Sequence, residues 1–311
     1  MIDYENLKIA VIGAGAMGCT YGMYLSRKND VLLVDVMQAH VDAINENGLE
    51  FTHLDGSVEF VKRVRATTDT SGCSPVDLVV LLTKGYQSAQ ALEKNATLIG
   101  PDTVVFSLQN GYGNADDIVK YVPESHIVLG TSGAGAIVRG PGKIQHAGQG
   151  PTCLGCMTEN QRNAELVAQA MIDCGIPSVE LVPNVKELIW TKLFVNIGVN
   201  AISAITGQTN QFIVNNPKSR EAAAMLVREA VEVANATGMD FDYDAMFQHV
   251  LDIALVTGDN IASMNADVRN KRRTEVDRIN GAVVSEGAKV GMKAPLNELI
   301  TNLIHAKELA Y

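Results

Sequence analysis

The sequence predicts an α/β protein in which a doubly wound parallel sheet precedes an all-helical domain. In the first half, short aliphatic runs without polar alternation separate amphipathic segments, which is typical of strands covered by helices on both faces. In the second half, the segments are long, alanine-rich and helically periodic, with glycine or proline near an end. The chain has 311 residues, a length that favours two domains. We expect them to comprise residues 1–183 and 184–311.

Five aliphatic runs in the first half predict the strands of the parallel sheet. They consist of leucine and β-branched residues, so we expect each to be a buried strand joined to the next by a helix. Two glycine-containing segments between residues 140 and 155 predict turns between short edge strands that close this sheet. The five runs are "LKIAVIG" at 7–13, "VLLVDV" at 31–36, "VDLVVLLT" at 76–83, "TVVFSLQ" at 103–109 and "HIVLGTS" at 126–132.

The segment "IAVIGAGAMG" predicts a dinucleotide-binding loop of the Rossmann type. Gly13, Gly15 and Gly18 have the GxGxxG spacing between a predicted strand and a predicted helix. In such loops the first glycine permits a tight turn, the second lets a pyrophosphate approach the backbone, and the third lets helix and strand pack closely. The phosphates would bind at the helix N-terminus, around Ala16 and Met17. The alternative is a glycine-rich turn used only for packing.

Two charged residues at strand ends bear on the choice of cofactor. Asp35 lies 22 residues after Gly13, where an acid accepts hydrogen bonds from the adenosine ribose hydroxyls. Its carboxylate would repel a 2′-phosphate, so it favours NADH over NADPH. Lys84, which closes a strand in "LLTKGYQS", could instead hold a phosphate. Asp35 could also be only a solvated strand end. We expect an NAD(P)H cofactor, with NADH favoured by Asp35.

The predicted helix "IWTKLFVNIGVNAIS" carries one polar stripe on an otherwise apolar surface. Lys192, Asn196 and Asn200 are spaced four residues apart, so they fall within an arc of about 80°. Because such a helix is buried, the stripe must face something polar. A buried Lys192 could be a general acid or the cation of a structural ion pair, and its residue type does not choose between them.

A second group of polar residues lies in "ASMNADVRNKRRTEVDRINGAVV". Ser263, Asp267 and Glu275 could contribute to a site. Ordinary structural explanations exist as well. Ser263 and Thr274 can cap helices, Thr274 to Asp277 has the spacing of a capping box, and Glu275 suits the first turn of a helix.

Composition argues against several classes of partner. A net charge of −10 and a pI near 5.1 oppose binding to nucleic acid or to an anionic membrane, so we expect a small-molecule partner. The N-terminus is acidic where a secretion signal is basic, and no uninterrupted apolar stretch reaches about 18 residues, which favours the cytoplasm. Five irregularly spaced cysteines do not form a disulfide framework, and Cys153 with Cys156 lacks the second pair of a zinc site. We expect no metal.

The order and spacing of these motifs resemble the ketopantoate reductase, or 2-dehydropantoate 2-reductase, family over the whole chain. The resemblance implies a Rossmann domain joined to a helical domain. It also implies reduction of ketopantoate to pantoate by a nicotinamide cofactor, a step towards pantothenate and coenzyme A. The matching segments, in order, are "GAGAMG", "LTKGYQS", "LQNGYGN", "WTKLFVNIGVN", "TGQTN", "SMNAD" and "RRTEVDRINGAV".

The resemblance further implies roles for single residues. Lys192 would be the general acid that protonates the carbonyl oxygen as hydride arrives. Glu275 would hydrogen-bond substrate and cofactor ribose and steady Lys192, and Asn110 would lie beside the nicotinamide and help to hold cofactor and substrate. The remaining residues would bind the hydroxyl and carboxylate ends of the substrate, and they are Asn196, Asn200, Asn210 and Ser263.

The second strand departs from the family's usual pattern. Many members favour NADPH and have a basic residue where this chain reads "VDVMQAH". NADH-dependent relatives include reductases of bulkier branched 2-oxo acids, of the D-2-hydroxyacid or D-mandelate dehydrogenase type, which is the alternative function. A non-catalytic dinucleotide sensor is a further alternative. Its signature would be the loss of Lys192 or Glu275, and both are present. The alanine-rich helical domain could form a homodimer.

Overall fold

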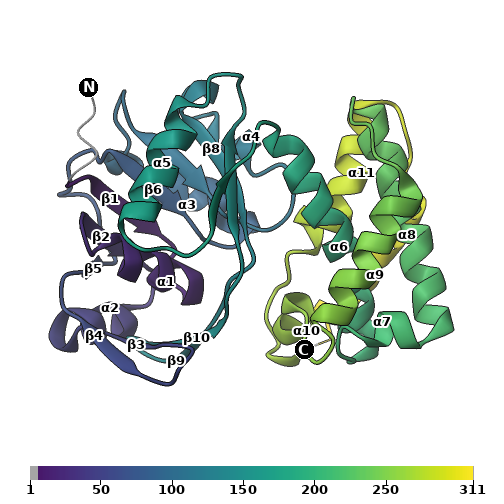
Figure 1. Ribbon diagram of the computed structural model, residues 1–311, viewed down its shortest axis with the longest axis horizontal. Helices are drawn as coiled ribbons and strands as arrows, with labels where there is room; N and C mark the ends of the chain where they lie inside the picture. The colour runs from purple at the N-terminus through teal and green to yellow at the C-terminus, as the bar shows by residue number, and fades with distance from the viewer. Residues whose placement is uncertain (1–5, 311) are drawn as a thin grey trace. The chain divides into compact units, whose positions relative to one another are not determined.

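The computed structural model describes residues 6–310, which divide into two compact units (Figure 1). The first unit is formed by the chain up to Gln109 together with Asn114–Leu188, and the second by Asn110–Gly113 together with the chain from Ile189 onwards. Each unit has its own apolar core. The expectation about a leader segment rests partly on residues 1–5, which lie outside the described residues.

The main sheet of the first unit has eight strands in the order β12-β11-β8-β7-β6-β1-β2-β5. The six strands from β8 to β5 are parallel. If these six are numbered by their order in the sequence, their order across the sheet is 6-5-4-1-2-3, which confirms the predicted doubly wound sheet. Five of these six are the predicted strands. The bounds are β1 Lys8–Ile12, β2 Asp30–Val34, β5 Arg65–Thr67, β6 Leu78–Leu81, β7 Val104–Ser107, β8 Ile127–Ser132, β11 Thr152–Cys156 and β12 Val179–Leu181.

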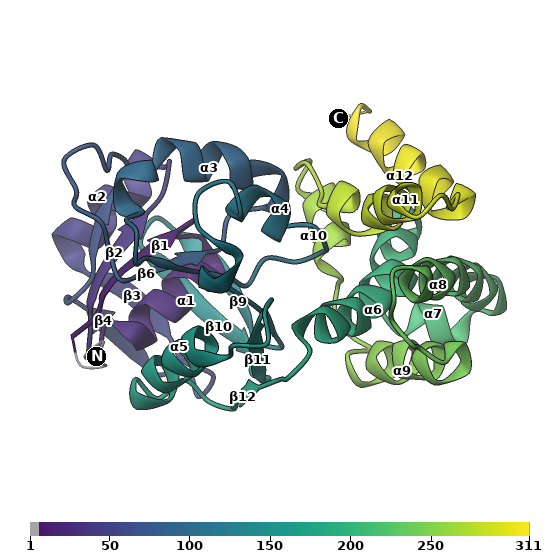
Figure 2. The ribbon, with the colours of Figure 1, turned by 90° about the horizontal axis from the view of Figure 1, so that it is seen from above.

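Helices cover both faces of the main sheet (Figure 2). Helices α1 (Ala16–Leu25) and α5 (Arg162–Asp173) lie on one face, and α3 (Ser88–Lys94) and α4 (Ala115–Ile118) lie on the other. Helix α2 (Gln38–Asn47) packs against β5. The central strands are buried along their whole length, which explains why their sequences are continuously apolar. Short 3₁₀ helices are η1 Gly85–Gln87, η2 Ala96–Leu98 and η3 Glu124–His126.

A second, smaller sheet has the order β4-β3-β10-β9, which the sequence did not indicate. Of the segments expected to close the main sheet, only β11 joins it, whereas β10 pairs with β3 of the small sheet. Helix α1 contacts strands of both sheets. Strands β3 and β10 mix polar with apolar residues, and β10 pairs with β3, which is far away in sequence. The bounds are β3 Leu49–Thr52, β4 Val58–Val61, β9 Gly135–Gly140 and β10 Lys143–Gly148.

The described part of the second unit is helical throughout, as predicted. Asn216 caps α8 and Asp242 caps α9 through side-chain oxygens. By length and composition α6 could cross a membrane, but 61% of its most apolar window is buried within the protein, which also suits a core helix. The bounds are α6 Val185–Thr206, α7 Phe212–Asn215, α8 Pro217–Ala236, α9 Tyr243–Val256, α10 Ser263–Arg269, η4 Val276–Arg278, α11 Asn280–Lys289 and α12 Pro295–Glu308.

Candidate functional site

The predicted cofactor residues of the first unit follow the carboxyl ends of three adjacent parallel strands. Gly13 follows β1, Asp35 follows β2 and Lys84 follows β6. The strand order reverses between β1 and β6, and open α/β sheets bind ligands beside such a reversal. Asn110 follows the next strand, β7, but belongs to the second unit.

The first and third glycines of the loop are required by the fold itself. Gly13 has φ +94°, and a Cβ there would lie 2.6 Å from the backbone nitrogen of Thr83. A Cβ on Gly18 would overlap the carbonyl oxygen of Gly13. The N–H groups of Gly13 and Ala14 both donate to Val34, at 2.9 and 3.1 Å, which ties the loop to the end of β2.

Gly15, in contrast, is not required by backbone conformation or by close packing. Its φ is −71°, the residue is exposed, and no atom lies within 4 Å of a Cβ built on it. It precedes α1, and no side chain of the described residues caps that helix. The first N–H groups of α1, near Ala16 and Met17, therefore remain available to an anion. The open space at Gly15 fits a pyrophosphate against the backbone better than a turn used only for packing.

A buried hydrogen-bond relay, formed by Cys19 and His40, holds the glycine-rich loop in place. The Cys19 thiol donates to Ala14 O at 3.1 Å, and Cys19 Sγ lies 3.4 Å from His40 Nε2. His40 Nδ1 accepts from the N–H of Gly142 at 3.0 Å, so a neutral His40 ring carries its proton on Nε2. Burial and, to a smaller extent, the Asp35 charge raise the pKa of the Cys19 thiol well above its ordinary value. The thiol is thus a stable donor to the loop.

Asp35 is held in a fixed position beside this loop. Its Oδ1 accepts from the N–H of Met37 at 2.9 Å, and its own N–H donates to Thr67 O at 3.1 Å. Lys84 is half-buried and directly follows Thr83, the residue against which Gly13 packs. Gln109 joins the ends of β6 and β7, because its amide nitrogen donates to Thr83 O at 2.8 Å. Gln109 stands beside Asn110 in the motif "LQNGYGN", which was the only sequence signal for it.

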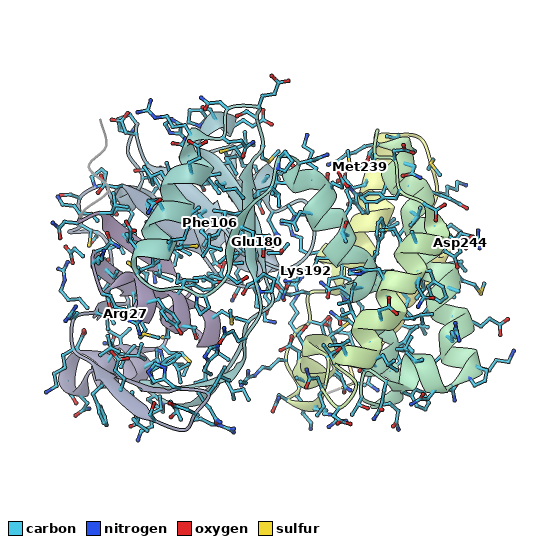
Figure 3. All side chains as sticks on the ribbon, viewed as in Figure 1. Arg27, Phe106, Glu180, Lys192, Met239 and Asp244 are labelled. Carbon is cyan, nitrogen blue, oxygen red and sulfur yellow. The ribbon has the colours of Figure 1, made fainter. Side chains whose placement is uncertain are left out.

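The polar stripe is present on α6. The helix is continuous from Val185 to Thr206, so Lys192, Asn196 and Asn200 share one face. Figure 3 labels Lys192 on this helix. Lys192 and Asn196 are half-buried and Asn200 is buried. The other faces enter the apolar core through Trp190, Leu193, Phe194 and Ile197.

Asn210 and Ser263 lie on segments anchored near the end of α6. Asn210 is buried and donates through Nδ2 to Thr257 Oγ1 at 2.9 Å, and its Oδ1 has no hydrogen-bond partner within residues 6–310. Ser263 is exposed and is the first residue of α10, whereas the capping position is Ala262. The capping explanation for Ser263 is therefore wrong. Asn265, which the sequence analysis did not single out, anchors α10 by donating to Gln208 O at 2.9 Å.

Glu275 is buried immediately before η4. The expected capping box is not formed. The Thr274 N–H donates to Glu308 Oε1 at 2.6 Å, and Asp277 accepts from His305 Nε2 at 2.8 Å and from Arg273 at 3.2 Å. The Thr274 N–H and the Asp277 carboxylate, which the sequence spacing assigned to each other, thus bind α12 instead, because its C-terminal turn offers a charged acceptor and a charged donor.

The segment Asn110–Gly113 is bound to the same part of the second unit. The Tyr112 N–H donates to Arg278 O at 2.9 Å, and Arg278 Nη1 donates to Gly113 O at 3.0 Å. The Tyr112 ring packs on Trp190 of α6, with ring centroids 4.8 Å apart. Asn110 is thereby tied to the segment that carries Glu275 and to the helix that carries Lys192. Arg278 lies in a matching motif, but its type alone did not indicate this contact.

The two cysteines of "CLGC" lie on β11 three residues apart and point to opposite faces of the strand. Within residues 6–310, no group of three or more histidine, cysteine, aspartate or glutamate residues could hold a metal ion.

Comparison with known proteins gives matches along most of the chain. The family described as "Ketopantoate reductase PanE/ApbA" matches residues 9–159, and "Ketopantoate reductase PanE/ApbA C terminal" matches residues 184–308. The 2-dehydropantoate 2-reductase of Streptococcus pyogenes serotype M18 is 33% identical over 302 residues, covering 96% of this chain and 97% of that protein.

Solved structures share the fold of the whole chain. A D-mandelate dehydrogenase solved with NADH and anilino(oxo)acetate is 31% identical, with a TM-score of 0.91, and the match covers 98% of this chain and 99% of that one. A PanE/ApbA family ketopantoate reductase from Ralstonia eutropha JMP134 is 29% identical, with a TM-score of 0.86, covering 97% and 98% respectively.

Proposed function

This chain belongs to the ketopantoate reductase family, and we propose that it reduces 2-dehydropantoate to pantoate with a nicotinamide cofactor. The observation that carries the proposal is the binding of Asn110–Gly113 to the segment of Glu275 and to α6. Through it, a loop that leaves the nucleotide-binding sheet is fixed to the elements bearing the expected acid and its partner carboxylate.

The residues of the first unit fit a dinucleotide. The open space at Gly15 and the uncapped N-terminus of α1 suit the pyrophosphate, and Asp35 suits the adenosine ribose. When bound, the reduced nicotinamide supplies the hydride. We propose that NADH is preferred, because the Asp35 carboxylate is fixed by its bond to Met37 and cannot easily turn away from a 2′-phosphate.

Lys192 is proposed as the general acid. It donates a proton from Nζ to the carbonyl oxygen of the substrate while hydride reaches the carbonyl carbon, so that an alcohol forms without a free alkoxide. Its half-buried place on an apolar helix supports this role, because a cation stabilises developing negative charge best where water is scarce. In this scheme, Glu275 holds Lys192 in position and binds the substrate and the cofactor ribose. Asn110 lies beside the nicotinamide and helps to hold cofactor and substrate.

The remaining polar residues are proposed to bind the substrate's hydroxyl and carboxylate ends. Asn210 supports this reading, because its buried Oδ1 is an acceptor that a substrate hydroxyl group could satisfy. Asn196 and Asn200 line the same helix face as Lys192. Ser263 is exposed at the start of α10, where it could reach a carboxylate.

The first experiment is the initial rate of ketopantoate reduction with NADH and with NADPH at equal concentrations. Rapid turnover supports the proposal. A higher kcat/KM with NADH supports the role of Asp35, whereas a higher value with NADPH would assign cofactor choice to Lys84 and its neighbours.

The second candidate is an NADH-dependent reductase of a bulkier branched 2-oxo acid. The TM-score of 0.91 with D-mandelate dehydrogenase and the presence of Asp35 favour it. A panel of 2-oxo acids decides between the two, and ketopantoate as the poorest substrate would select this candidate. No turnover with any member, together with cofactor binding, would indicate a non-catalytic sensor. We further propose that the protein is a cytoplasmic homodimer, and light scattering of the purified protein tests its oligomeric state.

A further inference from the structure

The C-terminal helix α12 holds the segment of Glu275 at two points. On the N-terminal side of Glu275, the Thr274 N–H donates to the carboxylate of Glu308 at 2.6 Å. On its C-terminal side, Asp277 receives a hydrogen bond from His305 Nε2 at 2.8 Å. Glu275 therefore lies between two residues that are fixed to the same helix turn.

His305 joins these two contacts into one cluster. Its Nε2 faces Asp277, and its Nδ1 lies 2.9 Å from Glu308 Oε2. Both partners are carboxylates, so both ring nitrogens must carry protons for both contacts to be hydrogen bonds. Only the imidazolium form satisfies this condition, and a neutral ring would leave one nitrogen lone pair facing a carboxylate oxygen.

The surrounding charges favour that form. Partial burial lowers the pKa of His305, but the hydrogen bonds and negative charges of Glu308 and Asp277 outweigh it and raise the pKa above the ordinary 6.5. Burial likewise raises the pKa of Glu308, and its bonds from Thr274 and His305 outweigh that effect and lower it. The other charged neighbours are Arg273, which binds Asp277, and Glu229 of α8, which binds the opposite end of α12.

We infer that His305 and Glu308 are positioning residues that hold Glu275 in place for the reaction, with full effect only while His305 is protonated. The inference rests on the role proposed above for Glu275. Neither residue touches substrate in this scheme, and both act through the backbone and side chains of Thr274 and Asp277.

The sign of the pH dependence follows from the two shifts. Because the pKa of His305 is raised on folding, its contribution is complete below its unfolded value and is lost as the pH rises through the folded value. Because the pKa of Glu308 is lowered, its contribution is present above its unfolded value and is lost only at lower pH. The contacts of α12 with Thr274 and Asp277 are therefore complete in mildly acidic solution, and they weaken as the pH becomes alkaline.

The test compares His305→Ala and Glu308→Gln with the wild-type full chain. Lys307→Ala is the matched control, since it removes a cation from the same helix turn. We expect the ratio of wild-type to His305→Ala kcat to be about tenfold in mildly acidic solution and to approach one as the pH rises, because a misplacement of about 1 Å can cost up to about 10²-fold and this change is indirect. A role in stability alone would leave the kcat of the folded His305→Ala variant equal to that of the wild type at every pH.

Amide hydrogen exchange provides a readout that needs no activity. In both variants we expect faster exchange in residues 274–278 than in the wild type, and no change there in Lys307→Ala. A kcat ratio that is constant across pH, or unchanged exchange in 274–278, would overturn the inference. If the wild type reduces no 2-oxo acid, the proposed function fails, while the exchange result still decides whether α12 holds this segment.

Discussion

The N–H of Tyr112 donates to the carbonyl oxygen of Arg278, 2.9 Å away, so the loop after β7 is bound to the chain three residues beyond Glu275. At the same place, Gly111 has φ +87°, and a Cβ there would overlap Arg278 O. The close approach of the two backbones therefore depends on glycine.

Gly111→Ala should lower kcat about tenfold, because the displaced backbone moves Asn110 and the Glu275 segment together. Gly207→Ala is the control, since Gly207 has φ +71° but no atom within 4 Å of a Cβ. It should cost only the strain of a left-handed residue, about 1–3 kcal/mol of unfolding free energy. Equal effects of both changes on kcat would show that the contact with Arg278 is irrelevant to the reaction.

Gly15→Ala should leave the unfolding free energy unchanged within about 0.5 kcal/mol, because neither its φ nor a neighbouring atom opposes a methyl group. Its methyl group would occupy the space proposed for the pyrophosphate, so the Kd of the cofactor should rise about tenfold or more. Fluorescence titration with NADH measures this. Gly72→Ala, at a position equally open, should change neither quantity. An unaltered Kd for Gly15→Ala would show that the cofactor phosphates do not bind at this loop.

Lys192→Ala should lower kcat by about 10²- to 10⁴-fold, the usual contribution of proton transfer. The Kd of the cofactor should stay the same, because the glycine-rich loop and Asp35 are intact. Lys186→Ala, which removes an exposed lysine from the same helix, should leave kcat near the wild-type value. If Lys192→Ala turned over at the wild-type rate, another group would have to supply the proton.

Asp35→Asn should raise the ratio of kcat/KM with NADPH to that with NADH by about tenfold, or about 1.4 kcal/mol. The substitution keeps an oxygen that accepts from Met37, so it removes the charge without removing the turn. Asp42→Asn removes an exposed carboxylate from α2 and serves as the control. An unchanged ratio of the two kcat/KM values would indicate that Asp35 is only a solvated strand end.

The sequence predicted the elements whose patterns are local. Continuous aliphatic runs identified five strands of the main sheet, and the spacing of Lys192, Asn196 and Asn200 identified one helix face. Strand β3 was missed and the segment of β10 was assigned to the wrong sheet, because both strands are half-polar and pair across a long stretch of chain. Their stability depends on partners that no local pattern reveals.

The supporting residues of the site were missed for a related reason. Cys19 and His40 form a relay behind the glycine-rich loop, but neither belongs to a motif and they lie 21 residues apart. His305 belongs to no motif of the sequence, and its partner Asp277 had a local explanation as part of a capping box that is not formed. Polar contacts between distant residues require the fold before they can be recognised.

Because Asn110–Gly113 belongs to the second unit, that unit is built from two separate stretches of chain. This affects both fragments of the protein and its synthesis. A fragment that begins at residue 184 would lack Tyr112, so one face of the Trp190 ring would lose its aromatic cover. On the ribosome, Gly113 is synthesised 165 residues before Arg278, the side chain that binds its carbonyl group. The second unit thus takes part of its packing from outside its own contiguous stretch, and this contact joins residues far apart in sequence, which is typical of slower folding.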